Sequence, residues 1–297
     1  MSLDQDQKSL FCIVNQGSGS DEINLTQAIR EFFKESGYHL HFLELTRKFD
    51  KDWIREEIQR SGAERVIAAG GDGTVKLAAE CLTGTDIPLA ILPAGSANGM
   101  ATELQIPAGV DEALQLAIGG VPTKVHAVLV NGEFCIHLAD LGFNAFLVKK
   151  FDSLSHRGML GYAKAAWHAL WNHRKMEVTL KMEEGTVTSQ AAMVVIANAT
   201  MYGTGVKINP VGKLTDDLFE VVLVKEYSLA EVLKMRFSRR GFNPKKVEFF
   251  QTRELRIRSK HPAHLQVDGE YQGKVQTLEA KLIPAAIQLV RPPDGSV

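Results

Sequence analysis

Short apolar segments alternate with amphipathic ones from Ser9 to the glycine pair Gly119–Gly120. Each apolar segment is long enough for one β-strand, and the segments between them carry hydrophobic residues at the three- and four-residue spacing of a helix face. The predicted strands are Ser9–Val14, His39–Leu45, Arg65–Ala69 and Leu89–Leu92. Because strands and helices alternate in this way, the sequence predicts an open parallel sheet covered by helices.

Three helices are predicted in this part of the chain. The first begins near Leu25 and follows the first strand. The second spans Asp50–Arg60, and the spacing places Trp53, Ile54 and Ile58 on its buried face. The third follows the third strand directly, so the connection between them is a sharp turn.

Strands dominate the chain after Gly119–Gly120. The pair Asn131-Gly132 separates Lys124–Val130 from Phe134–Ala139 and is typical of a tight hairpin turn. One helix is expected at roughly Gly158–Asn172. Further strands are predicted at Met176–Met182, Thr188–Ala199, Leu218–Lys225, Glu254–Arg258 and His264–Val267.

This change of pattern predicts two domains. Residues 1–121 are expected to form the α/β domain and residues 122–275 an antiparallel β domain. The last strands, within 276–297, could return to the first domain. A chain of 297 residues is long enough for two domains of ordinary size.

Composition and charge narrow the class of protein. The balance of 34 basic and 35 acidic residues gives a formal net charge of −1, which does not favour nucleic acid as a partner. The three cysteines form no C-x-x-C pair and are expected to be buried and reduced. The polar N-terminus and the lack of a long apolar run predict a cytoplasmic protein.

The most informative motif is Gly70-Gly71-Asp72-Gly73-Thr74, at the carboxyl end of the third predicted strand. Ligands of open α/β sheets bind beyond the carboxyl ends of strands, and glycines allow backbone N–H groups to approach phosphate oxygens. Thr74 is expected to cap the following helix. The alternative interpretation is a tight turn without a ligand, because glycine and aspartate suit any sharp turn.

A second glycine-rich loop, Gly95-Ser96-Ala97-Asn98-Gly99, follows the next strand. Ser96 and Asn98 could contact a nucleotide, and an ordinary helix cap explains them equally well. Neither a Walker lysine motif nor a complete G-x-G-x-x-G motif is present. The two loops therefore point to phosphate binding without a Walker lysine.

These loops, followed in order by Asp216-Asp217-Leu218 and Asp268-Gly269-Glu270, resemble the diacylglycerol kinase catalytic-domain family. That family includes bacterial lipid kinases and sphingosine kinases and is related to NAD kinases. The resemblance extends over nearly the whole chain and includes the motifs at 142–145 and 202–205. It implies an α/β ATP-binding domain, a β-sandwich lipid or substrate domain, and a cleft between them.

The resemblance also implies a reaction and a set of site residues. The reaction is magnesium-dependent transfer of the γ-phosphate of ATP to a lipid hydroxyl at a membrane surface. Glu270 would accept the hydroxyl proton, and Asp72 would act near the phosphates and the metal. A structural Mg²⁺ would be held by Asp216 with main-chain carbonyls at Lys213 or Leu214 and at Leu218. ATP would contact Asn15, Thr46, Gly70, Gly71, Gly73, Thr74, Gly95, Ser96 and Asn98.

The sequence departs from the family pattern at four positions. Lys76-Leu77 stand where the family usually has Asn-Glu, Gly99 where it has aspartate, and Asp217 where it has glycine. These departures leave open a kinase of a soluble alcohol such as NAD, and an inactive relative that binds nucleotide or lipid. The sequence also leaves open whether the protein forms a homodimer.

Contact with the membrane surface has one candidate segment in the sequence. Residues 236–246 interleave cations with aromatic side chains, which suits anionic headgroups. A solvated helix end followed by a basic loop explains the same residues.

Overall fold

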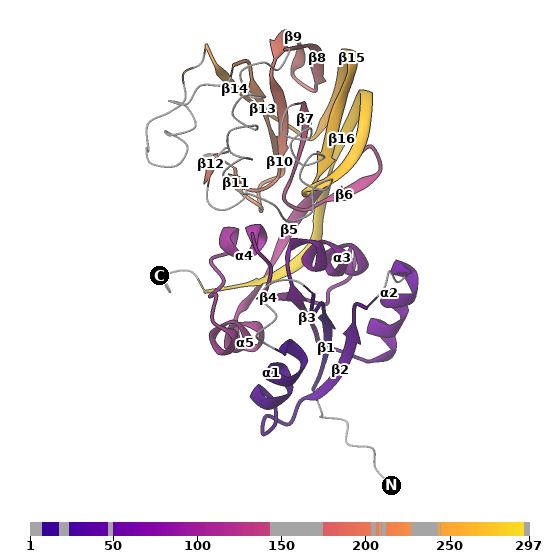
Figure 1. Cartoon of the computed structure of the whole chain (residues 1–297), viewed down its shortest axis with the longest axis vertical. Helices are drawn as coiled ribbons and strands as arrows, with labels where there is room; N and C mark the ends of the chain where they lie inside the picture. The colour runs from indigo at the N-terminus through magenta and orange to yellow at the C-terminus, as the bar shows by residue number, and fades with distance from the viewer. Residues whose placement is uncertain are drawn as a thin grey trace, which may run out of the picture. The chain divides into compact units, whose positions relative to one another are not determined.

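The computed structural model describes residues 8–17, 24–46, 50–142, 175–202, 206–207, 209, 212–226, 243 and 245–293. These residues belong to two compact units (Figure 1). The first comprises the chain up to Val125 and again from Ala285, and the second runs from His126 to Pro284. The chain passes between the units twice, within β5 (Val121–Val130) and within β16 (Glu270–Arg291).

The first unit is a parallel sheet with helices on both faces. Its strands lie in the order β16-β4-β3-β1-β2, and the end of β16 joins β4 in parallel through Leu289 and Leu89. The remaining strands are β1 (Ser9–Val14), β2 (His39–Glu44), β3 (Arg65–Gly70) and β4 (Leu89–Pro93). The helices are α1 (Leu25–Phe32), α2 (Lys51–Arg60), α3 (Asp72–Leu82), α4 (Gly99–Glu103) and α5 (Val110–Gly119).

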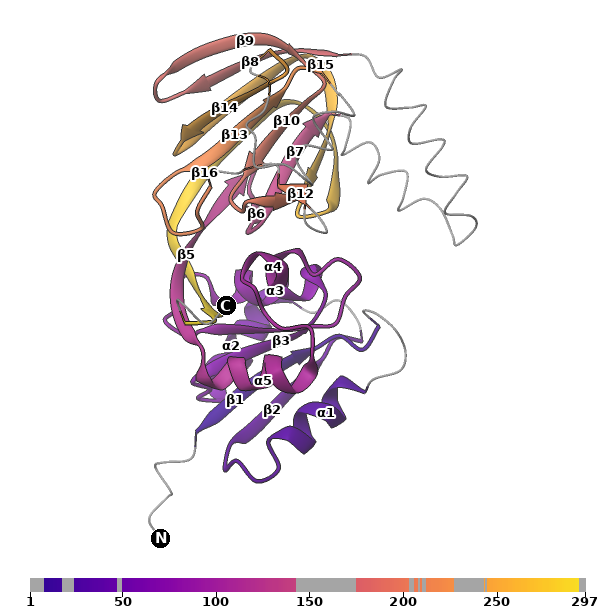
Figure 2. The ribbon, with the colours of Figure 1, turned by 90° about the vertical axis from the view of Figure 1, so that its left-hand side faces the viewer.

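Successive side chains of the central strands point to opposite faces of this sheet, and both faces are buried. Leu10, Cys12 and Val14 of β1 pack in one apolar cluster with Ile29 of α1 and Leu114 of α5. Helices α1 and α5 lie in front of the sheet in Figure 2, and α2 and α3 cover its other face. The predicted parallel sheet covered by helices is confirmed.

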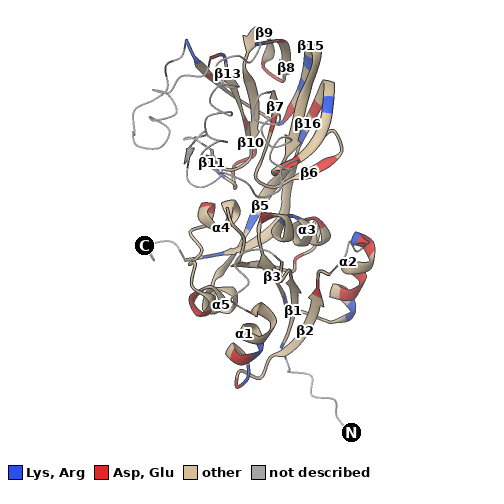
Figure 3. Cartoon of the chain, viewed as in Figure 1, with Lys and Arg blue, Asp and Glu red and all other residues tan. Residues whose placement is uncertain are grey.

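Helix α2 differs from its prediction at one residue. Asp50 caps it by accepting hydrogen bonds from the N–H groups of Asp52 and Trp53. Ile54 and Ile58 are buried as expected, but Trp53 is 41% exposed. Successive helix residues point about 100° apart, so Trp53 lies beside the inward stripe rather than in it. Figure 3 shows acidic and basic residues mixed on this helix, where Arg60 pairs with Glu56 and Glu57.

The second unit is an antiparallel β-sandwich. Its strands are hydrogen-bonded in the order β14-β13-β10-β7-β15-β16, and the hairpins β5–β6 and β8–β9 join this sheet through β16 and β15. Its other strands are β6 (Glu133–Cys135), β7 (Leu138–Gly142), β8 (Met176–Met182), β9 (Gly185–Ala191), β10 (Met193–Ala197), β13 (Phe219–Val224), β14 (Val247–Thr252) and β15 (Glu254–Val267). A separate two-stranded pair joins β11 (Met201–Tyr202) to β12 (Val206–Lys207).

The long strand β15 takes part in both halves of the sandwich. Residues near its start pair with β8, residues at its end pair with β7, and the register shifts between Arg258 and Ala263. This irregularity lets one strand turn the corner between two packed layers. The prediction of two separate strands, Glu254–Arg258 and His264–Val267, is therefore wrong.

Other predicted elements need smaller corrections. The expected strand Thr188–Ala199 is divided between β9 and β10. The Asn131-Gly132 hairpin is confirmed, with φ of 50° and 88° at the two residues. The predicted helix at 158–172, the motifs at 143–145 and 203–205, and residues 236–242 of the basic segment lie outside the described residues. No helix in the described ranges is both long enough and apolar enough to span a membrane.

Candidate active site

The first glycine-rich loop joins β3 to α3 without any intervening residue except Gly71. Gly71 has extended backbone angles and is the N-cap, so α3 begins at Asp72. Thr74 lies inside the first turn of the helix, and its N–H donates to the carbonyl of Gly71 at 3.0 Å. The expectation that Thr74 is the cap is wrong, because the cap is Gly71, three residues earlier. The Thr74 hydroxyl is buried, and it has no hydrogen-bond partner.

The second glycine-rich loop lies directly against the first. A Cβ placed on Gly95 would come within 2.5 Å of the Gly71 Cα, so only glycine fits there. Asn98 has a left-handed backbone, with φ of 50°. Its side chain closes the loop, because Oδ1 accepts from the Gly95 N–H and Nδ2 donates to the Gly95 carbonyl, both at 2.8 Å. The two predicted loops therefore form one continuous backbone surface.

Asp72 joins the two loops through its carboxylate. One oxygen accepts from the Gly99 N–H at 3.0 Å and the other from the Met100 N–H at 3.2 Å. These N–H groups begin α4, so Asp72 supplies the cap that the Asn98 side chain does not. A carboxylate has about four acceptor positions, and these contacts use two of them.

Asn15 and Thr46 follow the neighbouring strands at the same edge of the sheet. The N–H of Asn15 donates to the carbonyl of Ala69 at 2.9 Å, which places Asn15 beside the end of β3. Thr46 is exposed and lies one strand farther out, after β2. Ser96 is exposed as well. All the predicted nucleotide contacts therefore lie at the carboxyl edge of one sheet, where α/β folds bind ligands.

The Asp-Gly-Glu motif of the second unit forms the turn between β15 and β16. Asp268 and Gly269 have φ of 49° and 82°, and Glu270 is the exposed first residue of β16. The Asp268 carboxylate accepts hydrogen bonds from the backbone between β6 and β7. Sequence reasoning gave Asp268 no role, although an acidic residue at a tight turn is a signal for side-chain-to-backbone hydrogen bonds.

The predicted metal ligand Asp216 has one oxygen without a partner. Its Oδ1 is buried and accepts no hydrogen bond. Burial raises the pKa of this carboxyl above its usual value, and His126 and Lys213 oppose the rise. The carbonyl of Leu214 accepts from the His126 N–H at 3.0 Å. In the described part of the chain, no three His, Cys, Asp or Glu side chains are grouped to hold a metal, so the main chain would have to complete this site.

Next to Asp216 in sequence, Asp217 has a different partner. Its carboxylate lies 3.1 Å from a guanidinium nitrogen of Arg253, and both side chains are exposed. The backbone carbonyl of Asp217 also accepts from Arg253. Asp217 therefore links the loop before β13 to the residue between β14 and β15.

Sequence reasoning missed one buried polar residue near this loop, Glu220. Glu220 is 1% exposed and accepts hydrogen bonds from Asn209 at 2.6 Å and from Gln251 at 3.0 Å. Burial raises the pKa of Glu220. Asn209 also accepts from the Gly212 N–H, so the group fixes the chain that leads to Asp216. A single glutamate in the apolar strand Phe219–Val224 was the available signal.

Each of the two units matches a known family. Residues 9–130 match the diacylglycerol kinase catalytic domain, and residues 139–291 match the YegS C-terminal NAD kinase beta sandwich-like domain. The chain belongs to this family of lipid-kinase-like proteins. The family resemblance found in the sequence is therefore confirmed.

Individual family members are similar over nearly their whole length. A probable lipid kinase YegS-like from Chromohalobacter salexigens is 29% identical over 89% of this chain and 87% of its own. The probable lipid kinase YegS of Escherichia coli is 28% identical over 95% of this chain and 96% of its own. A crystal structure of a diacylglycerol kinase from Bacillus anthracis has a TM-score of 0.72, with 16% identity and 97% of each chain covered, which shows the shared fold.

The departures from the family pattern lie at described positions. Lys76 is buried in α3 and Leu77 is half-buried beside it. Gly99 is buried, and its backbone N–H is bound to Asp72. At this position the family usually offers a carboxylate, whereas this chain offers only main chain.

Proposed function

We propose that this protein is an ATP-dependent lipid kinase that phosphorylates the hydroxyl of a diacylglycerol-like or sphingoid lipid at a membrane surface. The observation that carries the proposal is the close approach of Gly71 and Gly95 at the carboxyl edge of the parallel sheet. Two glycine loops pressed together leave backbone where side chains would otherwise stand, which suits a polyphosphate. Membership of a lipid-kinase-like family supports the choice of a lipid acceptor.

The first unit would bind the nucleotide. The backbone of the two loops and the hydroxyl group of Ser96 would contact the phosphates, and Asn15 and Thr46 would line the rest of the ATP site. Asp72 keeps the two loops together through α4, and its remaining acceptor positions would face the metal-bound phosphates. Positioning of this kind is the main contribution of a protein to phosphoryl transfer.

The second unit would supply the base. The lipid hydroxyl oxygen attacks the γ-phosphorus, the bond from that phosphorus to the β–γ bridging oxygen breaks, and ADP leaves. The hydroxyl proton passes to the Glu270 carboxylate. Exposure of Glu270 at a hairpin turn supports this role, because a general base must reach its substrate.

The residues around Asp216 fit a cation, because a buried carboxylate oxygen there has no partner. Mg²⁺ would be held by Asp216 with the carbonyls of Leu214 and Leu218, and it supplies positive charge and fixed oxygen geometry. Mg²⁺ bound at this site would stabilise the folded protein by about 2.7 kcal/mol at a hundredfold excess over Kd. We therefore expect Mg²⁺ to raise the thermal unfolding temperature of the wild type. Asp216→Asn removes that rise, and an equal rise in the variant would contradict the site.

The function is tested by ADP release from ATP in mixed micelles that contain a panel of lipid alcohols. We expect release that requires both Mg²⁺ and one lipid class, and a phosphorylated lipid as the second product. Asp72→Ala is expected to abolish it. Lipid-independent ATP hydrolysis, or release unchanged by Asp72→Ala, would contradict the proposal.

Two alternative functions are tested in the same experiment. The second family match is described as an NAD kinase beta sandwich-like domain, which motivates an assay with NAD and no detergent or lipid. Phosphorylation of NAD there would replace the lipid by a soluble alcohol. The departure at Gly99 motivates the inactive alternative, for which ATP or lipid binds by calorimetry but no arm releases ADP.

A further inference from the structure

The Asp268-Gly269 turn is held by several hydrogen bonds to one side chain. Asp268 Oδ2 accepts from the Ile136 N–H at 3.0 Å, and Oδ1 accepts from the His137 and Leu138 N–H groups at 3.0 and 3.1 Å. The N–H of Asp268 also donates to the Leu138 carbonyl at 2.9 Å. The bend between β6 and β7 therefore wraps three successive N–H groups around one carboxylate.

A second set of contacts fixes the other side of the same turn. The N–H of Gly269 donates to Gln266 Oε1 at 2.7 Å, and Gln266 Nε2 donates to Asp140 Oδ2. Gln266 and Asp140 are 1% and 0% exposed, so the bond between them is buried, whereas Gly269 lies at the surface. Both residues of the turn are thus tied to β7 or to the bend before it.

The geometry of these contacts suits a carboxylate. Three N–H dipoles that converge on one point favour negative charge, and a carboxylate can accept all three bonds. An asparagine has the same shape, but its amide nitrogen would face an N–H donor and could not accept from it. Asp268 also has a φ of 49°, in the left-handed region that few L-residues other than asparagine and aspartate adopt, and its side-chain contacts hold the turn in that conformation.

We propose that Asp268 is the positioning residue for Glu270 and does not itself touch the reactants. This inference rests on the proposed function of Glu270 as the base. Glu270 is two residues from Asp268 and begins β16, so the backbone that carries it is fixed by the contacts to residues 136–138. A general base must stay within hydrogen-bond distance of its proton, and small displacements cost much of the rate.

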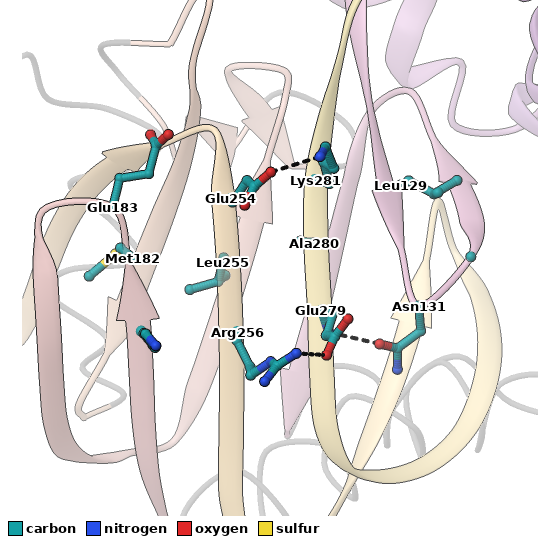
Figure 4. Close-up of a pocket in the computed structure, with 12 residues that line it drawn as sticks. Leu129, Asn131, Met182, Glu183, Glu254, Leu255, Arg256, Glu279, Ala280 and Lys281 are labelled. Atoms are coloured by element: carbon teal, nitrogen blue, oxygen red, sulfur yellow. Dashed lines mark hydrogen bonds and ion pairs between the residues drawn. The ribbon is translucent and has the colours of Figure 1, made fainter.

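The chain offers a matched control in a second turn of the same unit. Asn131 and Gly132 have nearly the same φ angles as Asp268 and Gly269. Asn131 Oδ1 accepts from the Glu279 N–H at 2.8 Å, as Figure 4 shows, so its side chain also ties a turn to a neighbouring strand. Asn131 and Gly132 line an open surface groove of about 830 Å³, together with Lys181, Arg256 and Lys281. The Asp-Gly-Glu motif is not part of the lining of this groove.

Steady-state kinetics with the best lipid, at a temperature where all variants are folded, test the proposal. Asp268→Asn is expected to lower kcat by between about tenfold and 100-fold, with KM for ATP within twofold of wild type. Asn131→Ala is expected to leave both constants unchanged. In a Glu270→Gln background, Asp268→Asn should have no further effect, because it acts through Glu270. A full additional loss there, or wild-type kcat in Asp268→Asn, would overturn the proposal.

Hydrogen exchange separates this inference from the proposed function. In Asp268→Asn the amides of Ile136, His137 and Leu138 are expected to exchange at least about tenfold faster than in wild type, and in Asn131→Ala they are not. If the wild type shows no phosphoryl transfer to any acceptor, the proposed function fails. The exchange result still decides whether Asp268 holds the turn, and unchanged protection would overturn its positioning role.

Discussion

At the scale of single residues, two positions of the candidate site make contacts that depend on their residue type. Gly95 is one, because its α-carbon lies against the backbone of Gly71. Asp72 is another, since its two oxygens bind two N–H groups 27 and 28 residues away. The sequence identified both residues through the motifs. It could not predict their contacts, because these depend on how two strand ends meet in space.

Replacement of Gly95 by alanine tests the contact between the loops. The added Cβ would lie 2.5 Å from a backbone atom, so one of the loops must move. We expect Gly95→Ala to lower stability by about 1–3 kcal/mol, measured by urea unfolding, and to weaken ATP binding, measured by calorimetry. Gly119→Ala is the control, because a Cβ there meets nothing within 4 Å. Wild-type stability and ATP affinity in Gly95→Ala would contradict the loop geometry.

At the scale of elements, strands β1, β3 and β4 were predictable because continuous apolar runs fill the centre of a parallel sheet. The edge strand β2 was predictable from its alternation, apart from one residue at its end. Helices α4 and α5 and strand β14 were not predicted. Strand β15 was divided in two, because the polar residues Ser259–His261 interrupt its apolar pattern at the corner of the sandwich.

Helix α4 takes its N-terminal cap from the side chain of Asp72. The helix is short, and the Asp72 carboxylate accepts its first N–H groups. We expect Asp72→Ala to lower the free energy of unfolding by about 1 kcal/mol in urea, in addition to its effect on phosphoryl transfer. Asp86→Ala, at an exposed aspartate of the same unit, should change it by less than about 0.5 kcal/mol. Equal midpoints for Asp72→Ala and wild type would show that the carboxylate does not cap α4.

At the scale of the whole molecule, the chain contains two compact units, and the proposed reaction draws on residues of both. The first gathers the predicted nucleotide contacts at one sheet edge, and the second carries Glu270 on a fixed turn. The fold class and the family could be recognised in the sequence, because the motifs keep their order along the chain. Asp268 could not be assigned, because its partners at 136–138 are more than 100 residues away and have no sequence signature.

The central claim is that Glu270 is the base for phosphoryl transfer to the lipid. The most direct measurement compares kcat and the Kd for ATP in wild type, Glu270→Gln and Glu279→Gln. Glu279 lies on the same strand, exposed and paired with Arg256, and is the matched control. We predict that Glu270→Gln lowers kcat by about 10² to 10⁴ with Kd for ATP unchanged, and that Glu279→Gln lowers neither. Wild-type kcat in Glu270→Gln would contradict the account.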